Sequence, residues 1–176
     1  MRLFVALALP DMVANALLLL ERSIPGARWM TREQLHLTLR FIGEVDGRDA
    51  AAIDDALAAI AAPAFTLSLK GVGEFGGKSP HALWVGVEAN EALNHLQRKI
   101  ETALQRIGLA AETRKFTPHI TLARLKAAPR ERLMHFLTDN ALYRSAPFEA
   151  NEFTLFSSVL TSDGSHYTPE RVYSLQ

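Results

Sequence analysis

Two segments of the chain alternate polar and apolar residues and carry the same pattern. The first is His36-Leu37-Thr38-Leu39, and the second, in the other half of the chain, is His119-Ile120-Thr121-Leu122. Successive side chains of a β-strand point to opposite faces, so the His and Thr of each copy would share one face while the aliphatic residues pack behind. The pattern predicts two strands, over about 35–42 and 116–125, each presenting an imidazole beside a hydroxyl.

The remaining periodicities predict strands and helices that follow one another along the chain. Strand-like alternation covers 2–9, 65–69, 81–87, 148–160 and 165–174, with a short strand at 29–30. Apolar residues at helical spacing cover about 10–23, 49–60, 90–107 and 129–137. The first of these helices is apolar nearly all round, so we expect it to be deeply buried. Strands 65–69 and 81–87 are expected to form a hairpin whose connection is the glycine-rich stretch between them.

Composition describes an ordinary globular chain. Of its 176 residues 48% are hydrophobic, enough to bury a substantial core. The absence of cysteine excludes disulfides, thiolate zinc sites and a cysteine nucleophile. Lys+Arg and Asp+Glu balance at 19 each, which argues against coating long nucleic acids but allows a small or terminal piece. The apolar run at the N-terminus stops at Pro10, so we expect a cytoplasmic protein without a signal peptide or membrane span and, by default, a monomer.

Paired histidines suit phosphodiester cleavage without a metal ion. Histidine has an unperturbed pKa of about 6.5, so one copy can accept a proton while the other donates one. Attack on phosphorus needs both, because water must lose a proton on one side of the phosphate and the leaving oxygen must gain one on the other. The hydroxyls of Thr38 and Thr121 would hydrogen-bond the non-bridging oxygens. One His-x-Thr is a weak signal, but two copies half a chain apart indicate a pseudo-twofold arrangement around a groove.

The longer segments around both copies resemble the two signature motifs of the two-histidine (2H) phosphoesterases. They read His36-Leu37-Thr38-Leu39-Arg40-Phe41-Ile42-Gly43 and Pro118-His119-Ile120-Thr121-Leu122-Ala123-Arg124. Within that group the chain is most similar, over nearly its whole length, to the RNA 2',3'-cyclic phosphodiesterases, also called 2'-5' RNA ligases. The resemblance implies an α+β, bilobal 2H phosphoesterase fold over residues 1–176, a single domain with antiparallel-rich sheets, outer helices and a central cleft.

The same resemblance implies an enzyme that opens the 2',3'-cyclic phosphate at the end of an RNA, such as a tRNA fragment, to a 2'-phosphate, with neither metal nor cofactor. By that analogy His36 is the proton donor to the leaving 3'-oxygen and His119 is the base for water. The residues alone do not say which histidine has which role. Formation of 2'-5' linkages would be the same chemistry with a 5'-hydroxyl in place of water, run in reverse.

Three further residues are candidates for binding the substrate. Ideal alternation puts Arg124 on the strand face opposite to His119, so a bulge near Ala123 would be needed to bring it to the phosphate. Phe41 could stack on a terminal base or belong to the core. His166 lies beside a predicted turn at 161–164 and could contact the substrate. Basic residues outnumber acidic ones in segment 112–132, which would suit a polyanion at the mouth of the cleft or simply a solvated surface.

Three alternative functions remain open at this point. A zinc site could use the two histidines, but a third ligand is expected and the motifs supply threonine. A non-catalytic module could bind RNA ends without turning them over. A 2H enzyme could act on another small phosphodiester, such as a cyclic nucleotide or a cyclic phosphate of ADP-ribose.

Overall fold

The structure is a computed structural model and describes the whole chain, residues 1–176. In chain order the elements are β1 (Arg2–Ala8), α1 (Asp11–Leu18), β2 (Ala27–Trp29), the short 3₁₀ helix η1 (Arg32–Gln34), β3 (His36–Glu44), α2 (Gly47–Ala58), β4 (Phe65–Leu67), β5 (Leu69–Phe75), β6 (Ala82–Val87), α3 (Glu91–Arg106), β7 (His119–Leu125), α4 (Arg130–Asp139), β8 (Phe148–Ala150), β9 (Glu152–Thr161) and β10 (Gly164–Ser174). No helix among them has the length and hydrophobicity needed to cross a membrane.

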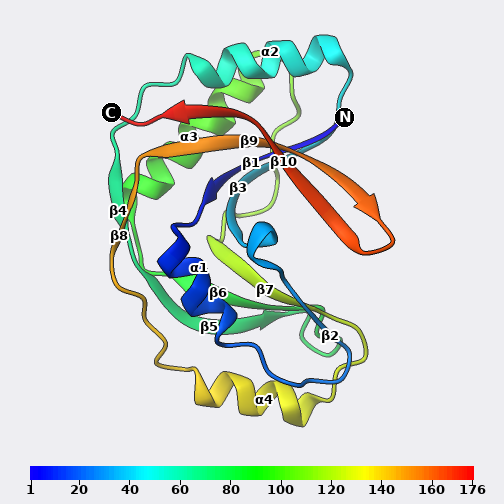
Figure 1. The fold of residues 1–176 in the computed structure, drawn as a ribbon. Helices are drawn as coiled ribbons and strands as arrows, with labels where there is room; N and C mark the ends of the chain where they lie inside the picture. Colours follow the sequence, from blue (N-terminus) through cyan, green and yellow to red (C-terminus); the bar gives the residue numbers. More distant parts are fainter.

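Two four-stranded antiparallel sheets form the centre of the fold (Figure 1). Sheet A has the strand order β10-β9-β1-β3 and sheet B the order β2-β7-β6-β5, while β4 and β8 pair separately. Helices α2 and α3 contact each other at the top of the view, and α4 lies at the bottom, below sheet B. This is the α+β arrangement of antiparallel sheets and outer helices that the resemblance implies.

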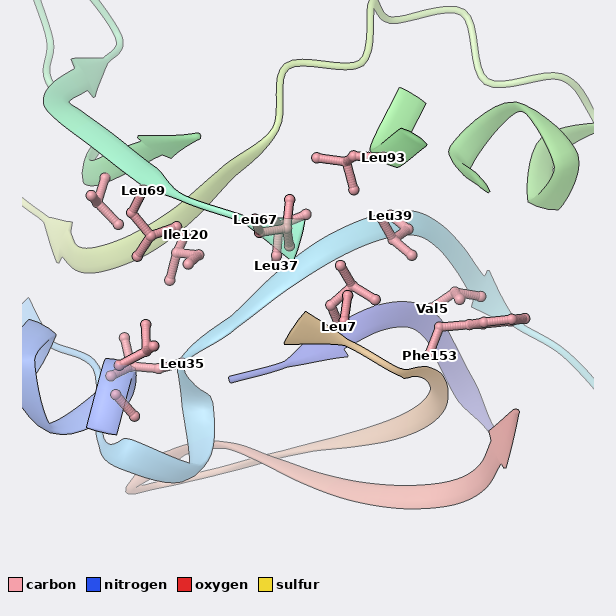
Figure 2. Packing of buried hydrophobic residues seen from close by; sticks show 14 of the residues in the cluster. Val5, Leu7, Leu35, Leu37, Leu39, Leu67, Leu69, Leu93, Ile120 and Phe153 are labelled. Atoms are coloured by element: carbon pink, nitrogen blue, oxygen red, sulfur yellow. The ribbon is translucent and has the colours of Figure 1, made fainter. Parts of the chain in front are cut away.

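The two motif strands lie against each other where the sheets meet. β3 is one of the two edge strands of sheet A, and β7 lies between β2 and β6 in sheet B. The aliphatic residues of both strands enter one hydrophobic core, in which Leu37, Leu39 and Ile120 are almost fully buried. Figure 2 shows these side chains with core residues of other strands and of α3. With the aliphatic face buried, the His and Thr of each motif are left on the other face.

The glycine-rich stretch after residue 69 is a strand, so the predicted hairpin connection is wrong. This stretch is β5, which pairs with β6, whereas the segment predicted to pair with β6 forms β4 and pairs with β8. Gly73 lies opposite Trp84, and a Cβ at Gly73 would be only 2.2 Å from Cζ2 of that indole. The glycine makes room for a large ring on the sheet, and composition alone suggests a loop there.

The first helix is shorter and less buried than predicted. α1 ends at Leu18, and its buried residues are Val13, Ala14 and Leu17. Met12 is 84% exposed, and Leu19, just after the helix, is 86% exposed. The helix is fully buried along one side only, so Met12 and Leu19 stay in solvent and Leu18 and Leu20 are only partly buried, although the sequence is apolar nearly all round.

Candidate active site

Both motif strands break their alternation at the same place. In β3, Ala6 pairs with Thr38 but the preceding Val5 pairs with Arg40, so Leu39 has no partner in the register. In β7, Trp84 pairs with Thr121 and the preceding Leu83 pairs with Ala123. Each strand therefore contains a bulge one residue after its threonine.

The bulges return a later side chain to the face that carries His and Thr. In both strands the two residues after the threonine are buried and the third is exposed. That third residue is Phe41 in β3 and Arg124 in β7, each five positions after its histidine. The bulge near Ala123 that the sequence argument requires is therefore confirmed, and β3 contains the same feature.

A single cleft of about 560 Å³ brings the two motifs together. Its lining includes the His and Thr of both motifs, together with Phe41 and Arg124. Other residues that line it are Arg2, Gln34, Phe75, His81, Arg114 and Tyr167. Both sheets contribute to these walls, so the cleft lies between the two halves of the fold.

His36 is packed against three aromatic rings of sheet A. Its ring stacks on Phe4, with 4.9 Å between the ring centroids, and Tyr167 meets it edge-on at 5.0 Å. Phe156 lies farther away, at 6.0 Å. Burial lowers the pKa of His36 to about 4, a hydrogen bond to the backbone of Gln34 opposes the shift, and the nearby charges of Arg124 and His119 add to it. In the free protein at neutral pH this imidazole is uncharged.

His119 is packed against aromatic residues of sheet B and has a fixed orientation. Phe75 meets its ring edge-on at 4.8 Å, and Trp84 lies 6.3 Å away. Its Nδ1 lies 2.7 Å from the carbonyl oxygen of Thr117. Because a carbonyl can only accept, Nδ1 carries the proton and Nε2 of the neutral ring keeps its lone pair. Burial lowers the pKa of His119, the bond to Thr117 opposes this, and Arg124 lowers it further.

Arg124 is the cationic group shared by the two motifs. Arg124 lines the same cleft as both imidazoles, and its charge lowers the pKa of His36 and that of His119. The side chain is exposed in the cleft. A guanidinium at this position can neutralise an anion that lies between the two rings.

The other predicted binding residues have different outcomes. Phe41 is 56% exposed and lines the cleft, so it does not belong to the core. His166 is exposed and does not line the cleft, whereas its neighbours Ser165 and Tyr167 do. Alternation along β10 turns His166 to the other face of the sheet, so its position does not support the predicted contact with substrate.

The basic residues of segment 112–132 do not form one patch. Arg114 and Arg124 line the cleft, but Arg130 donates to the carbonyl of Gly77 and Arg132 to that of Ser23. The last two residues therefore help to attach α4 to neighbouring loops. Of the basic residues in this segment, only Arg114 and Arg124 line the cleft.

Several cleft residues are not among the site residues that the sequence predicts, including Tyr167, Phe75 and His81. His81 stacks on Phe75 with 6.3 Å between the ring centroids, and Phe75 in turn contacts His119. For Tyr167 the only available signal is alternation, which separates His166 from its neighbours but does not say which side faces the cleft. Phe75 lies in the glycine-rich stretch, which the sequence predicts to be a loop. His81 begins the predicted strand 81–87 but has no partner residue at a diagnostic spacing in the sequence.

Groups of His, Asp and Glu that could hold a metal ion are absent from the site and from the rest of the chain. The polar side chains that line the cleft carry imidazoles, hydroxyls, guanidinium groups and an amide.

Comparison with known proteins connects this cleft to a described family. A model of the 2'-5' RNA ligase superfamily matches residues 10–160. An RNA 2',3'-cyclic phosphodiesterase of Archaeoglobus fulgidus is 30% identical over 177 residues, which cover 98% of this chain and 99% of that protein. A protein of the same name from Geobacillus stearothermophilus is 40% identical over 105 residues, 58% of this chain, but the match spans only 33% of that protein.

The likeness extends to the three-dimensional structure. The crystal structure of E. coli LigT complexed with 3'-AMP has a TM-score of 0.80 against this chain, at 27% identity. The match covers 99% of this chain and 97% of the other. It therefore takes in both sheets and the cleft between them.

Proposed function

The chain belongs to the 2'-5' RNA ligase superfamily, and we propose that within it the protein hydrolyses RNA ends that carry a 2',3'-cyclic phosphate, producing 2'-phosphate ends without a metal ion. The observation that carries the proposal is the pair of His-x-Thr motifs in one cleft that Arg124 also lines. The names of the relatives described above support the same substrate class.

His119 acts as the base in this mechanism. The carbonyl of Thr117 holds the proton of the neutral ring on Nδ1, so Nε2 is free to take a proton from water. The lowered pKa of His119 keeps the ring unprotonated at neutral pH. As the proton leaves, the water oxygen forms a new bond to phosphorus.

His36 acts as the acid. As the P–O3' bond breaks, His36 transfers its proton to the leaving 3'-oxygen, and the phosphate stays on the 2'-oxygen. In the free protein the pKa of His36 is only about 4, so the charged form has to be stabilised by the substrate. A cyclic phosphate carries a negative charge, and an anion beside the ring raises the pKa.

The remaining groups of the cleft bind the phosphate and the nucleoside. The hydroxyls of Thr38 and Thr121 donate to the non-bridging oxygens, and Arg124 neutralises their charge. Phe41, exposed at the cleft, stacks on the terminal base. We assign the reaction to the cytoplasm, to a monomer, and to substrates such as the ends of cleaved tRNA.

The decisive test is incubation of a short RNA ending in a 2',3'-cyclic phosphate, with and without EDTA, followed by identification of the phosphate product. We expect a 2'-phosphate in both conditions. His36→Ala and His119→Ala should each lower kcat by about 10²-fold or more, and Thr38→Ala and Thr121→Ala should lower kcat/KM by about 10- to 100-fold. His135→Ala, which changes an exposed histidine of α4, is the matched control.

Each departure from this result has a definite meaning. Activity within a few-fold of the wild type in either motif-histidine variant contradicts the two-histidine mechanism, and loss of activity in EDTA contradicts metal independence. Tight binding without turnover means a module that binds RNA ends. Faster hydrolysis of a cyclic mononucleotide or of an ADP-ribose cyclic phosphate than of RNA reassigns the substrate. Addition of an RNA with a 5'-hydroxyl shows whether the same site forms 2'-5' linkages.

A further inference from the structure

Residues 110–118 form the later part of the connection between α3 and β7 and carry two groups that bear on the cleft. Arg114 lines the cleft, and Thr117 supplies the carbonyl that binds Nδ1 of His119. The segment contains no helix or strand. It also takes part in none of the backbone-to-backbone hydrogen bonds that are made outside helices and strands. Side chains must therefore determine its position.

Two side chains from other elements hold the beginning of the segment. The Arg40 guanidinium of β3 donates from Nη2 to the carbonyl of Ala110 at 2.5 Å. The Glu101 carboxylate of α3 accepts from the backbone N–H of Glu112 at 2.9 Å. At the other end the hydrogen bond is the one from His119 to Thr117. The segment is thus attached at two places, one at Arg40 and Glu101 and one at His119.

Arg40 and Glu101 also form a buried ion pair with each other. Nε of Arg40 lies 2.5 Å from Oε2 of Glu101, and the side chains are only 7% and 15% exposed. Burial alone would raise the pKa of Glu101, but the hydrogen bonds from Arg40, from the N–H of Glu112 and from Gln105 hold it below its usual value. The carboxylate is therefore charged and fully engaged.

Arg40 is the residue that follows the bulge of β3. It also donates from Nη1 to the carbonyl of Phe41, the cleft residue next to it. From α3, Gln97 donates to the carbonyl of the bulged Leu39 at 3.4 Å. The corresponding position in β7 is Ala123, which has no polar side chain. The Arg40 connection therefore runs one way, from the first motif to the segment that precedes the second.

We propose that Arg40 and Glu101 are positioning residues for the second motif, which fix segment 110–118 so that the Thr117 carbonyl meets Nδ1 of His119 and Arg114 stays at the cleft. The proposal rests on the proposed function in so far as His119 is taken as the base. A buried ion pair is weak evidence of a stabilising role, because apolar residues of similar size often serve stability equally well. The fork of a guanidinium, in contrast, reaches Glu101, Ala110 and Phe41 at once, which neither an apolar chain nor lysine can do.

Loss of the attachment has a specific consequence for His119. Without a fixed acceptor at Nδ1, the neutral ring is free to carry its proton on Nε2 instead, and in that form it cannot accept a proton from water in the cleft. The fraction of molecules with a competent base falls, and the ring loses its orientation. The expected effect is a lower kcat with a nearly unchanged KM for a short substrate.

The test uses the double variant Arg40→Met/Glu101→Leu in the full chain, which removes both charges together and leaves neither one unpaired in the core. We expect a folded protein whose kcat is about 10- to 100-fold lower. Amide hydrogen exchange of 110–118 should be faster, and the ¹⁵N chemical shifts of His119 should report a mixture of tautomers. If the double variant does not fold, Arg40→Lys, which keeps the charge near Glu101, is examined with the same measurements.

Tyr173→Phe is the matched control. It removes another partly buried side-chain hydrogen bond, from the Tyr173 hydroxyl of β10 to Asp54 of α2 at 2.8 Å, and should leave kcat, the exchange of 110–118 and the His119 tautomer unchanged. A folded Arg40 variant with wild-type exchange and a single Nδ1–H tautomer overturns the positioning role. Exchange and tautomer are measured without substrate, so failure of the proposed RNA reaction is distinguishable from failure of this proposal.

Discussion

His36 and His119 occupy equivalent positions in their strands, but their surroundings differ. His36 is enclosed by Phe4, Phe156 and Tyr167, whereas His119 contacts Phe75 and Trp84. Burial lowers the pKa of His36, the residue assigned as acid, to about 4, and it also lowers the pKa of His119. Both rings are therefore neutral in the free protein at neutral pH. His36 becomes protonated only when the negative charge of the bound phosphate raises its pKa.

The pH dependence of catalysis follows from these pKa values. Both histidine pKa values lie below 6.5 in the free protein, so above pH 6.5 the base is already deprotonated. There kcat/KM should fall steadily with rising pH, because the protonated fraction of the acid His36, whose pKa is about 4, keeps decreasing. The bound phosphate raises the pKa of His36, so the profile of kcat should lie at higher pH than that of kcat/KM. Arg124→Gln should shift the kcat/KM profile to higher pH, since Arg124 lowers both pKa values. Steady-state kinetics from pH 4.5 to 9 give these profiles, and coincident, flat profiles would contradict the prediction.

At the scale of single elements, the sequence predicts most strands and helices because their apolar spacing is regular. α3 is an example, with buried residues at Leu93, Leu96, Ile100 and Leu104 and Asn90 as its N-cap, accepting from the N–H of Leu93. The sequence failed at β5, where glycines accommodate a ring contributed by another strand. Such a contact depends on tertiary packing, which the β-strand propensity of the segment itself does not report. The sequence also does not predict which face of β10 lines the cleft. Alternation shows that His166 and Tyr167 point to opposite faces, but only the fold determines which face meets the cleft.

A substitution at Gly73 tests whether β5 packs closely against the Trp84 ring of β6. A methyl group there would meet the Trp84 ring at 2.2 Å, so Gly73→Ala should lower the free energy of unfolding by about 1–3 kcal/mol, as overpacking does. The matched control is Gly47→Ala at the start of α2, where an added Cβ has no atom within 4 Å. It should be neutral or stabilising by up to about 1 kcal/mol. Urea unfolding measures both, and equal effects of the two substitutions would argue against close packing of Trp84 on Gly73.

At the scale of the whole molecule, the two sheets are joined by more than the core. Gln34 donates from Nε2 to the carbonyl of Ser165 at 2.9 Å, and Arg28 of β2 donates to the carbonyl of Asp163. These bonds attach the hairpin formed by β9 and β10, at the right of Figure 1, to the part of the chain that leads from sheet B into β3. The walls of the cleft are therefore tied together, and its shape depends on global folding.

The stability of the whole molecule should depend on pH through His36. The folded-state pKa is about 4, against 6.5 for an unperturbed histidine, so the unfolded state binds the proton first as the pH falls. The free energy of unfolding should therefore decrease as the pH falls from 6.5 to about 4, and His36 should cause no further decrease below about pH 4. His36→Phe, which keeps a ring among the aromatic neighbours, should lose less stability between pH 7 and 4.5 than the wild type. His135→Phe on α4 is the control, and an unchanged difference in His36→Phe would contradict the assignment.

The matching bulges have a consequence for the orientation in which a substrate binds. A ligand that recognised only the two His-x-Thr motifs could enter the cleft either way round, because the motifs are near copies with the same burial pattern. The orientation of the substrate must therefore be selected by residues at which the two motifs differ. The bulges bring one such pair into the cleft, Phe41 on one side and Arg124 on the other. An aromatic ring in one motif and a guanidinium in the other therefore allow the cleft to distinguish the two ends of a bound substrate, although the two motifs are otherwise alike.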